Sequence, residues 1–301
     1  MATVLSPEIL MKGGNIMSQA PCCSKGHAAT FPRIIHQTYK TEIIPEHWQA
    51  SQDTWKSKHA GFQYVFWTDS DILVLVTKFY PQYLEIYNNL KYNIMRVDFA
   101  RALILFKFGG IYSDLDVVPS VSFVEYMQFV EKSYPHTNTM LAEGPSPMLE
   151  FFLTNFILVS KPGARDFWPH YIEHVVTNDN SLVPWYLRAL QTSKHYYVMT
   201  KTGPTAVSIV HKHLAQKNLT NNIHIIPSTF VGGGKVYNKS GSVDADALFG
   251  HVEGSSWTGN SSESCGVAMQ LYDSRETFLI CALVLFMLLF ITFTILYIKK
   301  K

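Results

Sequence analysis

The pattern of apolar and polar positions along the chain predicts alternating strands and helices in its first 120 residues. Short runs rich in β-branched and aromatic residues predict strands, and longer segments whose apolar residues share one face predict helices. The predicted elements are strands at 33–39, 63–67 and 111–118 and helices at 45–59, 69–79 and 96–108. Such alternation is typical of an α/β domain with a mainly parallel central sheet.

The predicted helix at 96–108 contains two charges among apolar residues. Asp98 and Arg101 lie in this helix, and such side chains are rarely buried unless they are paired or used. The helix is followed by Gly109 and Gly110, which can supply the left-handed ending common at helix C-termini. The ordinary alternative is an ion pair on a helix surface, which contributes only about 0.2–0.5 kcal/mol. The apolar setting favours a functional pair.

Two carboxylates follow at the end of the predicted strand at 111–118. In an extended segment residues i and i+2 share a face, so Asp114 and Asp116 are expected to point the same way and Leu115 toward the core. Two hard oxygen donors on one face suit Mg²⁺ or Mn²⁺ carrying phosphates. His36, Gln37 and Thr38 end the first predicted strand, where an α/β sheet often meets its ligand, although a strand running into a loop explains them equally well.

Other phosphate-binding and metal-binding patterns are missing from the sequence. There is no G-x-G-x-x-G between a strand and a helix, and residues 232–235 lack the glycine spacing and the hydroxyl of a Walker loop. The formal charge of +2 does not suggest a nucleic-acid partner. The cysteines have no zinc-like spacing, and both a disulfide from Cys22 or Cys23 to Cys265 and free thiols stay open.

The two ends of the chain differ in character. Residues 1–30 are expected to be a flexible lead-in, with folded structure beginning at residue 31. Residues 278–298 form an uncharged apolar run long enough for one membrane-spanning helix. The basic tail at 299–301 favours the cytosol, which places the body in the lumen, with residues 259–277 as a stalk.

Three sequons agree with a luminal body, at Asn218, Asn238 and Asn260. Residues 1–30 contain no apolar run of signal-peptide length. Two explanations are open: a longer natural N-terminus, or a tail-anchored protein whose body faces the cytosol. We favour the first.

The motifs at 34–38, 98–101 and 109–116, in that order, resemble the D-x-D sugar-binding region of glycosyltransferase family 32. That family includes yeast-type Golgi mannosyltransferases and the catalytic subunits of mannosyl-inositol-phosphoceramide synthase. The resemblance covers residues 31–120, with weaker agreement to about 258. It implies a GT-A-like nucleotide-diphospho-sugar transferase fold, with one catalytic domain at 31–258.

The resemblance also implies roles for single residues. Asp116 would be the direct ligand of the divalent cation, and Asp114 would contact the donor ribose or sugar and support the metal. Asp98 and Arg101 would bind donor sugar hydroxyls, and Arg101 would also meet the charge of the phosphate leaving group. Tyr112 would line the donor pocket.

Later motifs of the family are also matched. Asn155, in an Asn-led strand, is a candidate sugar contact. His251 would complete the cation site, and Ser256 and Trp257 would close over the diphosphate; a surface loop is the alternative. The Thr-Gly-Pro sequence at 202–204 opens a helix and either shapes the acceptor side or is purely structural.

The implied reaction is the Mn²⁺- or Mg²⁺-dependent transfer of a hexose, with retention, from a nucleotide-diphospho-sugar to a lipid or glycan hydroxyl. GDP-mannose and an inositol-phosphoceramide-like acceptor are the first expectation, and UDP-galactose or UDP-glucose is the alternative donor. A catalytically silent glycan-binding relative and a metal-dependent phosphotransferase are the rival classes. The expected location is the Golgi or ER membrane, with a regulatory subunit as a further partner.

Overall fold

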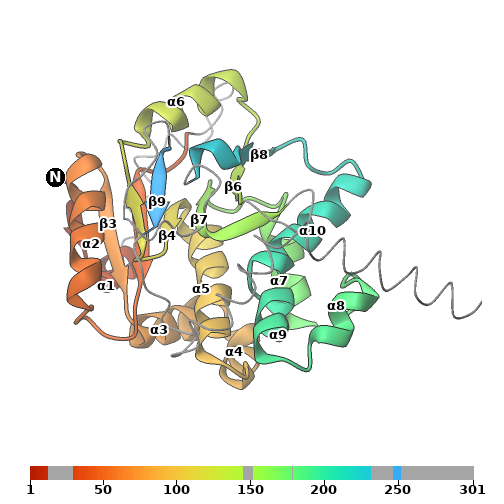
Figure 1. Cartoon of the computed structure of the whole chain (residues 1–301). Coiled ribbons are helices and arrows are strands. Elements are labelled where there is room, and N and C mark those ends of the chain that lie inside the picture. The colour runs from red at the N-terminus through yellow and green to blue at the C-terminus, as the bar shows by residue number, and fades with distance from the viewer. Residues whose placement is uncertain (13–29, 145–151, 178, 232–246, 252–301) are drawn as a thin grey trace, which may run out of the picture. The chain divides into compact units, whose positions relative to one another are not determined.

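The computed structural model describes residues 1–12, 30–144, 152–177, 179–231 and 247–251 of the 301-residue chain. In this part of the chain, seven strands form one sheet in the order β1-β3-β2-β4-β7-β6-β8 (Figure 1). The strands are β1 Thr3–Leu5, β2 Ile34–Thr38, β3 Gln63–Trp67, β4 Gly110–Ser113, β6 Thr139–Glu143, β7 Leu153–Ser160 and β8 Ile223–Ile226. Neighbours run parallel except at β7, which is antiparallel to both β4 and β6. The predicted α/β class and mainly parallel sheet are therefore confirmed.

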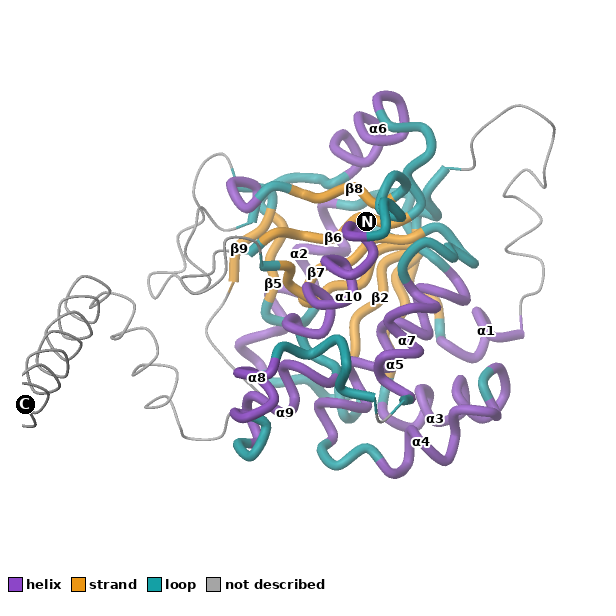
Figure 2. The backbone as a smooth tube through the Cα atoms, turned by 90° about the vertical axis from the view of Figure 1, so that its right-hand side faces the viewer, coloured by secondary structure: helices purple, strands orange, loops and turns teal. Residues whose placement is uncertain are grey.

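Helices cover both faces of this sheet. They are α1 Pro7–Lys12, α2 Glu46–Lys58, α3 Asp69–Phe79, α4 Leu84–Asn89, α5 Asn93–Phe108, α6 Val124–Ser133, α7 Trp168–Val176, α8 Trp185–Leu190, α9 Lys194–Lys201 and α10 Pro204–Gln216. Trp55 of α2 and Met127 of α6 pack with Ile35 and Ile111 in one buried cluster on one face. Helix α5 packs on β4 and β7, α10 packs on β7, and α7 packs against α5. The strands lie in the middle of these helices in Figure 2.

The turn between α5 and β4 requires glycine. Gly109 ends α5 at φ 65° and Gly110 follows at φ 93°. A Cβ atom at Gly110 would lie 2.5 Å from the carbonyl oxygen of Ile34. Because such an approach excludes any side chain, Gly110 allows β4 to pair closely with β2.

The start of the chain differs from the sequence prediction. Residues 1–12 are not a flexible lead-in: β1 pairs in parallel with β3 at the edge of the sheet, with Thr3 opposite Gln63. The amide of Ala2 donates to the carbonyl of Lys56 (2.7 Å), and α1 follows β1 directly. A three-residue strand is too short for its hydrophobic period to be recognised in a sequence.

The strand predicted at 111–118 is also wrong, because it is two strands separated by a turn. Strand β4 ends at Ser113, residues 114–116 turn, and β5 (Val117–Pro119) pairs antiparallel with β9 (Phe249–His251) in a separate two-stranded sheet. The carbonyl of Val117 accepts hydrogen bonds from Ser51 Oγ (2.7 Å) and Trp55 Nε1 (2.8 Å), which hold β5 on α2. Asp114 and Asp116 therefore do not share the face of one strand, in contrast to the sequence prediction.

The described residues belong to one compact unit, Met1–Glu253. Within them, no helix is both long enough and apolar enough to cross a membrane. The predicted stalk at 259–277, the span at 278–298 and the basic tail at 299–301 lie outside the described residues.

Candidate active site

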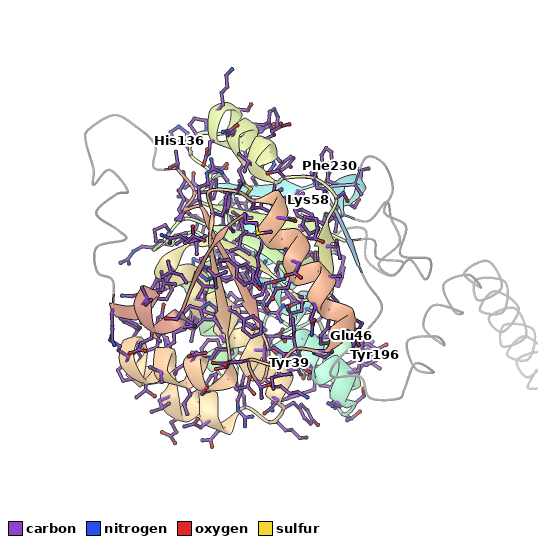
Figure 3. The ribbon with its side chains drawn as sticks, turned by 90° about the vertical axis from the view of Figure 1, so that its left-hand side faces the viewer. Tyr39, Glu46, Lys58, His136, Tyr196 and Phe230 are labelled. Carbon is purple, nitrogen blue, oxygen red and sulfur yellow. The ribbon has the colours of Figure 1, made fainter. Side chains whose placement is uncertain are left out.

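The candidate site forms at the edge of the sheet where β2, β3 and β4 end. Strand β7 runs antiparallel to β4, so its first residues reach the same edge. Helix α5 precedes β4 and runs back across it, so its N-terminal half also lies there. In Figure 3, Tyr39, just beyond β2, lies near Glu46, the first residue of α2, and farther from Lys58, the last residue of that helix.

Asp98 of α5 is buried, with its carboxylate bound from three directions. Oδ1 accepts a hydrogen bond from Asn155 Nδ2 (2.9 Å) and lies 3.0 Å from Arg101 Nη2, while Oδ2 accepts one from Thr202 Oγ1 (2.9 Å). Burial raises the pKa of Asp98 to about 6, although Arg101 and these hydrogen bonds oppose the rise. Asp98 and Arg101 are therefore an interior pair, not the surface pair that the sequence left open.

Arg101 connects Asp98 to Asp114. Its Nη1 donates to the carbonyl of Asn155 (2.5 Å) and lies 3.3 Å from the Asp114 carboxylate, and its guanidinium carbon lies 4.7 Å from the centre of the Tyr112 ring. The side chain is 4% exposed. Both terminal nitrogens are thus engaged by protein oxygens, and this geometry makes Arg101 a support for Asp114.

Asp114 is held by further groups from β2 and β4. The hydroxyl of Tyr112 donates to Asp114 Oδ1 (2.8 Å) and is hydrogen-bonded to Thr38 Oγ1 (2.9 Å). Gln37 Nε2 donates to the backbone carbonyl of Asp114 (3.2 Å), and Gln37 Oε1 accepts from Tyr64 (2.6 Å). The Asp114 side chain nevertheless stays 29% exposed. The Asp114 carboxylate can therefore contact a ligand while Tyr112 and Arg101 hold it in position.

Asp116 lies two residues further, in the turn after β4, and is half-buried. Burial and the neighbouring charge of Asp114 raise the pKa of Asp116 to about 8. No lysine or arginine in the described part of the chain forms a salt bridge with it. A bound cation would stabilise the ionised form of Asp116, which burial and the charge of Asp114 disfavour. Carboxylate oxygens are ligands that Mn²⁺ and Mg²⁺ accept.

His251 is the remaining predicted metal ligand, and the structure describes only its backbone. His251 in β9 lies opposite Val117 of β5, the residue after Asp116. Its side chain, and the whole of Ser256 and Trp257, lie outside what the structure describes, so their roles stay predictions. Among the described residues, no group of three or more His, Cys, Asp or Glu side chains is arranged to hold a metal ion. Asp114 and Asp116 fit two of the ligand positions of a cation site, and at least one further ligand is needed to complete it.

His36 was predicted to contact the ligand, and the structure places it elsewhere. The side chain is fully buried, its Nε2 lies 2.9 Å from the carbonyl oxygen of Gly109, and its Nδ1 accepts a hydrogen bond from Trp67 Nε1 (3.1 Å). Burial lowers the pKa of His36 to about 4, so the ring is neutral and donates from Nε2. It ties the C-terminal end of α5 to β2 and β3 and does not reach the carboxylates.

Gln37 and Thr202 contribute to the site in ways that the sequence did not predict. Gln37 was expected at the ligand edge of the sheet, and it instead supports the backbone of Asp114. Thr202 was expected either to shape the acceptor side or to start a helix, and its hydroxyl binds Asp98 across 104 residues of sequence. Of the other predicted residues, the structure brings together Thr38, Asp98, Arg101, Tyr112, Asp114 and Asn155.

The chain is similar in sequence to known proteins. Residues 45–140 match the family described as "Glycosyltransferase sugar-binding region containing DXD motif". The chain is 28% identical over 243 residues to mannosyl phosphorylinositol ceramide synthase SUR1 of Saccharomyces cerevisiae, covering 75% of this chain and 51% of that protein. It is 46% identical over 90 residues to inositol phosphoceramide mannosyltransferase 3 of Schizosaccharomyces pombe, covering 30% of this chain and 25% of that protein. The chain thus matches about half, or less, of the length of these relatives.

Among solved structures, a glycosyltransferase involved in glycosylation of the major capsid of PBCV-1 is similar, with 13% identity and a TM-score of 0.43 over 74% of this chain and 94% of that one. A score at this level does not establish a shared fold. The sequence match, in contrast, confirms the predicted glycosyltransferase D-x-D region, and it contains Asp98, Arg101, Asp114 and Asp116.

Proposed function

We propose that the chain is a divalent-cation-dependent glycosyltransferase with a GT-A-like fold that moves a hexose from a nucleotide-diphospho-sugar to a hydroxyl acceptor. GDP-mannose is the first donor to test and an inositol phosphoceramide the first acceptor, because the names of the similar proteins describe mannose transfer and inositol phosphoceramide. One observation carries the proposal: a buried network of Asp98, Arg101 and Tyr112 holds Asp114 beside Asp116, which lacks a cation partner in the described part of the chain.

The two carboxylates of the D-x-D sequence have different tasks in this proposal. Asp116, with Asp114 and with His251 as a further ligand, would hold Mn²⁺ or Mg²⁺. When bound, such an ion neutralises the charge that grows on a departing diphosphate. Asp114, partly exposed and fixed in orientation, would accept hydrogen bonds from the hydroxyls of the donor.

The buried residues position these groups. Arg101 favours the charged form of Asp114 and keeps the carboxylate directed toward the site, since it contacts both Asp114 oxygens at 3.3 Å. Asp98 holds Arg101 in turn, and the neutral partners Asn155 and Thr202 fix Asp98 without adding charge. A preorganised set of dipoles and charges of this kind need not rearrange during the reaction.

Further parts of the proposal rest on the sequence alone. Ser256 and Trp257 would close over the diphosphate, and the segment at 278–298 would anchor the protein in a Golgi or ER membrane with its body in the lumen. Retention at the anomeric carbon and a regulatory subunit belong to the same proposal. UDP-galactose and UDP-glucose are the alternative donors.

The test is a transfer assay with the purified full chain in detergent. GDP-mannose, UDP-galactose and UDP-glucose are compared with Mn²⁺ or with EDTA, in the presence and absence of inositol phosphoceramide. We expect turnover of one donor that EDTA abolishes and that Asp116→Asn lowers by at least about a hundredfold, because the cation site is lost. Asp53→Asn removes a charge from the exposed face of α2 and serves as the matched control. Binding of no nucleotide sugar, or full activity of Asp116→Asn, would refute the proposal.

A further inference from the structure

Asn218 lies in the turn that ends α10, in a backbone conformation that glycine usually adopts. It is the only non-glycine residue with a positive φ in the described part of the chain, at 58°. Its amide donates to the carbonyl of Ala215 (3.0 Å), and the next amide, of Leu219, donates to the carbonyl of Leu214 (3.0 Å). These two hydrogen bonds form the Schellman ending of a helix, which fixes the backbone of Asn218.

Asn218 also begins the sequence Asn-Leu-Thr, in which N-linked glycosylation can occur because the middle residue is not proline. Asn218 and Leu219 are exposed, and Thr220 is half-buried. The side chains of Asn218 and Thr220 form no hydrogen bond with another described residue, so none of these residues competes for the groups that the modification uses. The sequons at Asn238 and Asn260 lie outside the described residues.

A purely structural role at this position would be served better by glycine. Glycine has no Cβ atom, so it adopts a positive φ without the steric cost that other residues carry. Asparagine tolerates the left-handed conformation better than most side chains, and it is the second choice at this point of a helix ending. The chain has asparagine here together with a hydroxyl two residues later, which favours a second use for the side chain.

The strand that follows this turn has an open edge. Strand β8 is the last strand of the sheet and pairs, among the described strands, with β6 alone. Its sequence Ile-His-Ile-Ile contains no proline and no Lys, Arg, Asp or Glu that would discourage another strand from pairing with it. The amide of Ile223 donates to the carbonyl of Thr220 (2.9 Å), so the turn leads directly into β8. A bulky group on Asn218 would therefore lie next to this edge.

The turn is separated from the candidate active site by the length of α10. Thr202, which binds Asp98, comes just before this helix, and Asn218 comes just after it. The 13 residues of α10 extend over about 20 Å. In Figure 1, the segment between α10 and β8 lies at the periphery of the described fold. A large group attached there would leave the carboxylates accessible to a ligand.

We propose that Asn218 carries an N-linked glycan and that this glycan covers the open edge of β8. The glycan would come from an oligosaccharide on a lipid diphosphate. The amide nitrogen of Asn218 bonds to the anomeric carbon, and the bond from that carbon to the diphosphate oxygen breaks. The diphosphate leaves with the electron pair, and a base of the transferring enzyme takes one amide proton. This inference rests on the luminal location in the proposed function, because the transfer takes place in the lumen.

The first measurement locates the glycan. The full chain is produced in a eukaryotic secretory pathway and treated with a peptide N-glycosidase, which converts each asparagine that carried a glycan to aspartate. We expect peptide mass spectrometry to find aspartate at position 218 and unchanged asparagine at 221, which is exposed in the same connection but begins no sequon. Thr220→Ala should abolish the conversion, and Thr220→Ser, which keeps the hydroxyl, should retain it.

The outcomes separate this inference from the proposed function. Modification of Asn238 or Asn260 without modification of Asn218 would refute the inference and leave the luminal location intact. A chain with no glycan at any sequon would refute both. Absence of hexose transfer by the natural chain would defeat the proposed activity, and conversion at position 218 would still support the glycan.

The second measurement tests the covering of the edge. Asn218→Gly keeps the left-handed turn and removes the acceptor, so its free energy of unfolding should not fall and its hexose transfer should not change. We nevertheless expect Asn218→Gly and Thr220→Ala to aggregate severalfold faster than the natural chain and Thr220→Ser. Hydrogen exchange of the aggregates should show added protection at 223–226, because another strand has paired with β8.

Two results would overturn the covering of the edge. One is equal aggregation of the chains with and without the glycan. The other is faster aggregation without added protection at 223–226, which would show that the glycan acts only as a general solubilising group.

Discussion

Replacing Arg101 with glutamine leaves two carboxylates, those of Asp98 and Asp114, without the cation that both contact. Arg101 lies 3.0 Å from Asp98 Oδ1 and 3.3 Å from the Asp114 carboxylate, and its side chain is 4% exposed. Glutamine retains some of the packing and one amide donor but no charge. The variant therefore measures how strongly this site depends on a buried cation.

The expected loss is large and depends on pH. Removal of one partner of a buried ion pair costs about 3–5 kcal/mol, since the remaining charge is desolvated without compensation. With Arg101 present, burial already raises the pKa of Asp98 to about 6. Without it the pKa rises further, so the folded variant binds a proton more tightly than the unfolded chain does. Its stability is then favoured at low pH and is lost as the pH rises from about 4 toward the raised pKa.

We therefore expect Arg101→Gln to lose about 3–5 kcal/mol of unfolding free energy at pH 8 and roughly half of that, or less, at pH 5. Urea denaturation followed by tryptophan fluorescence at both pH values measures this. Asp98→Asn added to the variant should restore part of the loss at pH 8 and little at pH 5.

Arg96→Gln is the control. Arg96 lies on the same helix, is half exposed and donates to the carbonyls of Tyr87 and Asn88, so its loss should cost less than about 1 kcal/mol. A loss below about 1 kcal/mol for Arg101→Gln at pH 8, or one that is equal at both pH values, would refute the account of a buried cation between two carboxylates.

Further predictions concern the cation site and the glycine turn. Without added metal, Asp116→Asn should raise the melting temperature at pH 8.5 and change it little at pH 5, because the pKa of about 8 means that the natural carboxylate pays a desolvation cost only when it ionises. A drop in melting temperature at pH 8.5 would contradict this. Mn²⁺ binding at pH 7 should release up to about one proton from Asp116, which calorimetry in buffers of different ionisation enthalpy detects, and an affinity that does not rise between pH 6.5 and 8.5 would disagree. Gly110→Ala should destabilise the fold by at least about 2 kcal/mol more than Gly61→Ala, because both have positive φ but only Gly110 lies against the carbonyl of Ile34. Equal losses in urea denaturation would show that the close approach has no cost.

Elements with a clear local signal were predicted well from the sequence. The strand at 63–67 and the helix at 69–79 have the predicted bounds, and Thr68 caps that helix with Asp71 in a reciprocal capping box. Gly109 also ends α5 with a positive φ as expected, although its ψ of −161° is not the left-handed helical value. Each of these depends on side chains within a few residues of the backbone that they control, which is information that a sequence contains.

The failures have a common physical origin in contacts between distant segments. The turn at 114–116 forms because Val117 leaves the main sheet to pair with β9, more than 130 residues away in sequence. His36 and Thr38 lie on one face of β2. His36 is nevertheless hydrogen-bonded to Gly109 and Trp67, while Thr38 is hydrogen-bonded to Tyr112 in the site. Periodicity predicts which face a side chain occupies, but the partner it meets there depends on tertiary packing.

The hydrogen bonds to Asp98 have a consequence for how the protein can be divided. Its neutral partners Asn155 and Thr202 lie 57 and 104 residues away, outside the matched segment at 45–140. That segment also includes β4, but both of its neighbours in the sheet, β2 and β7, lie outside the segment. A shortened chain limited to 45–140 would leave both edges of β4 open to aggregation and would leave Asp98 desolvated or exposed. The matched segment at 45–140 is therefore not an autonomous folding unit, and the geometry of its site is completed only when the chain has folded through the start of α10.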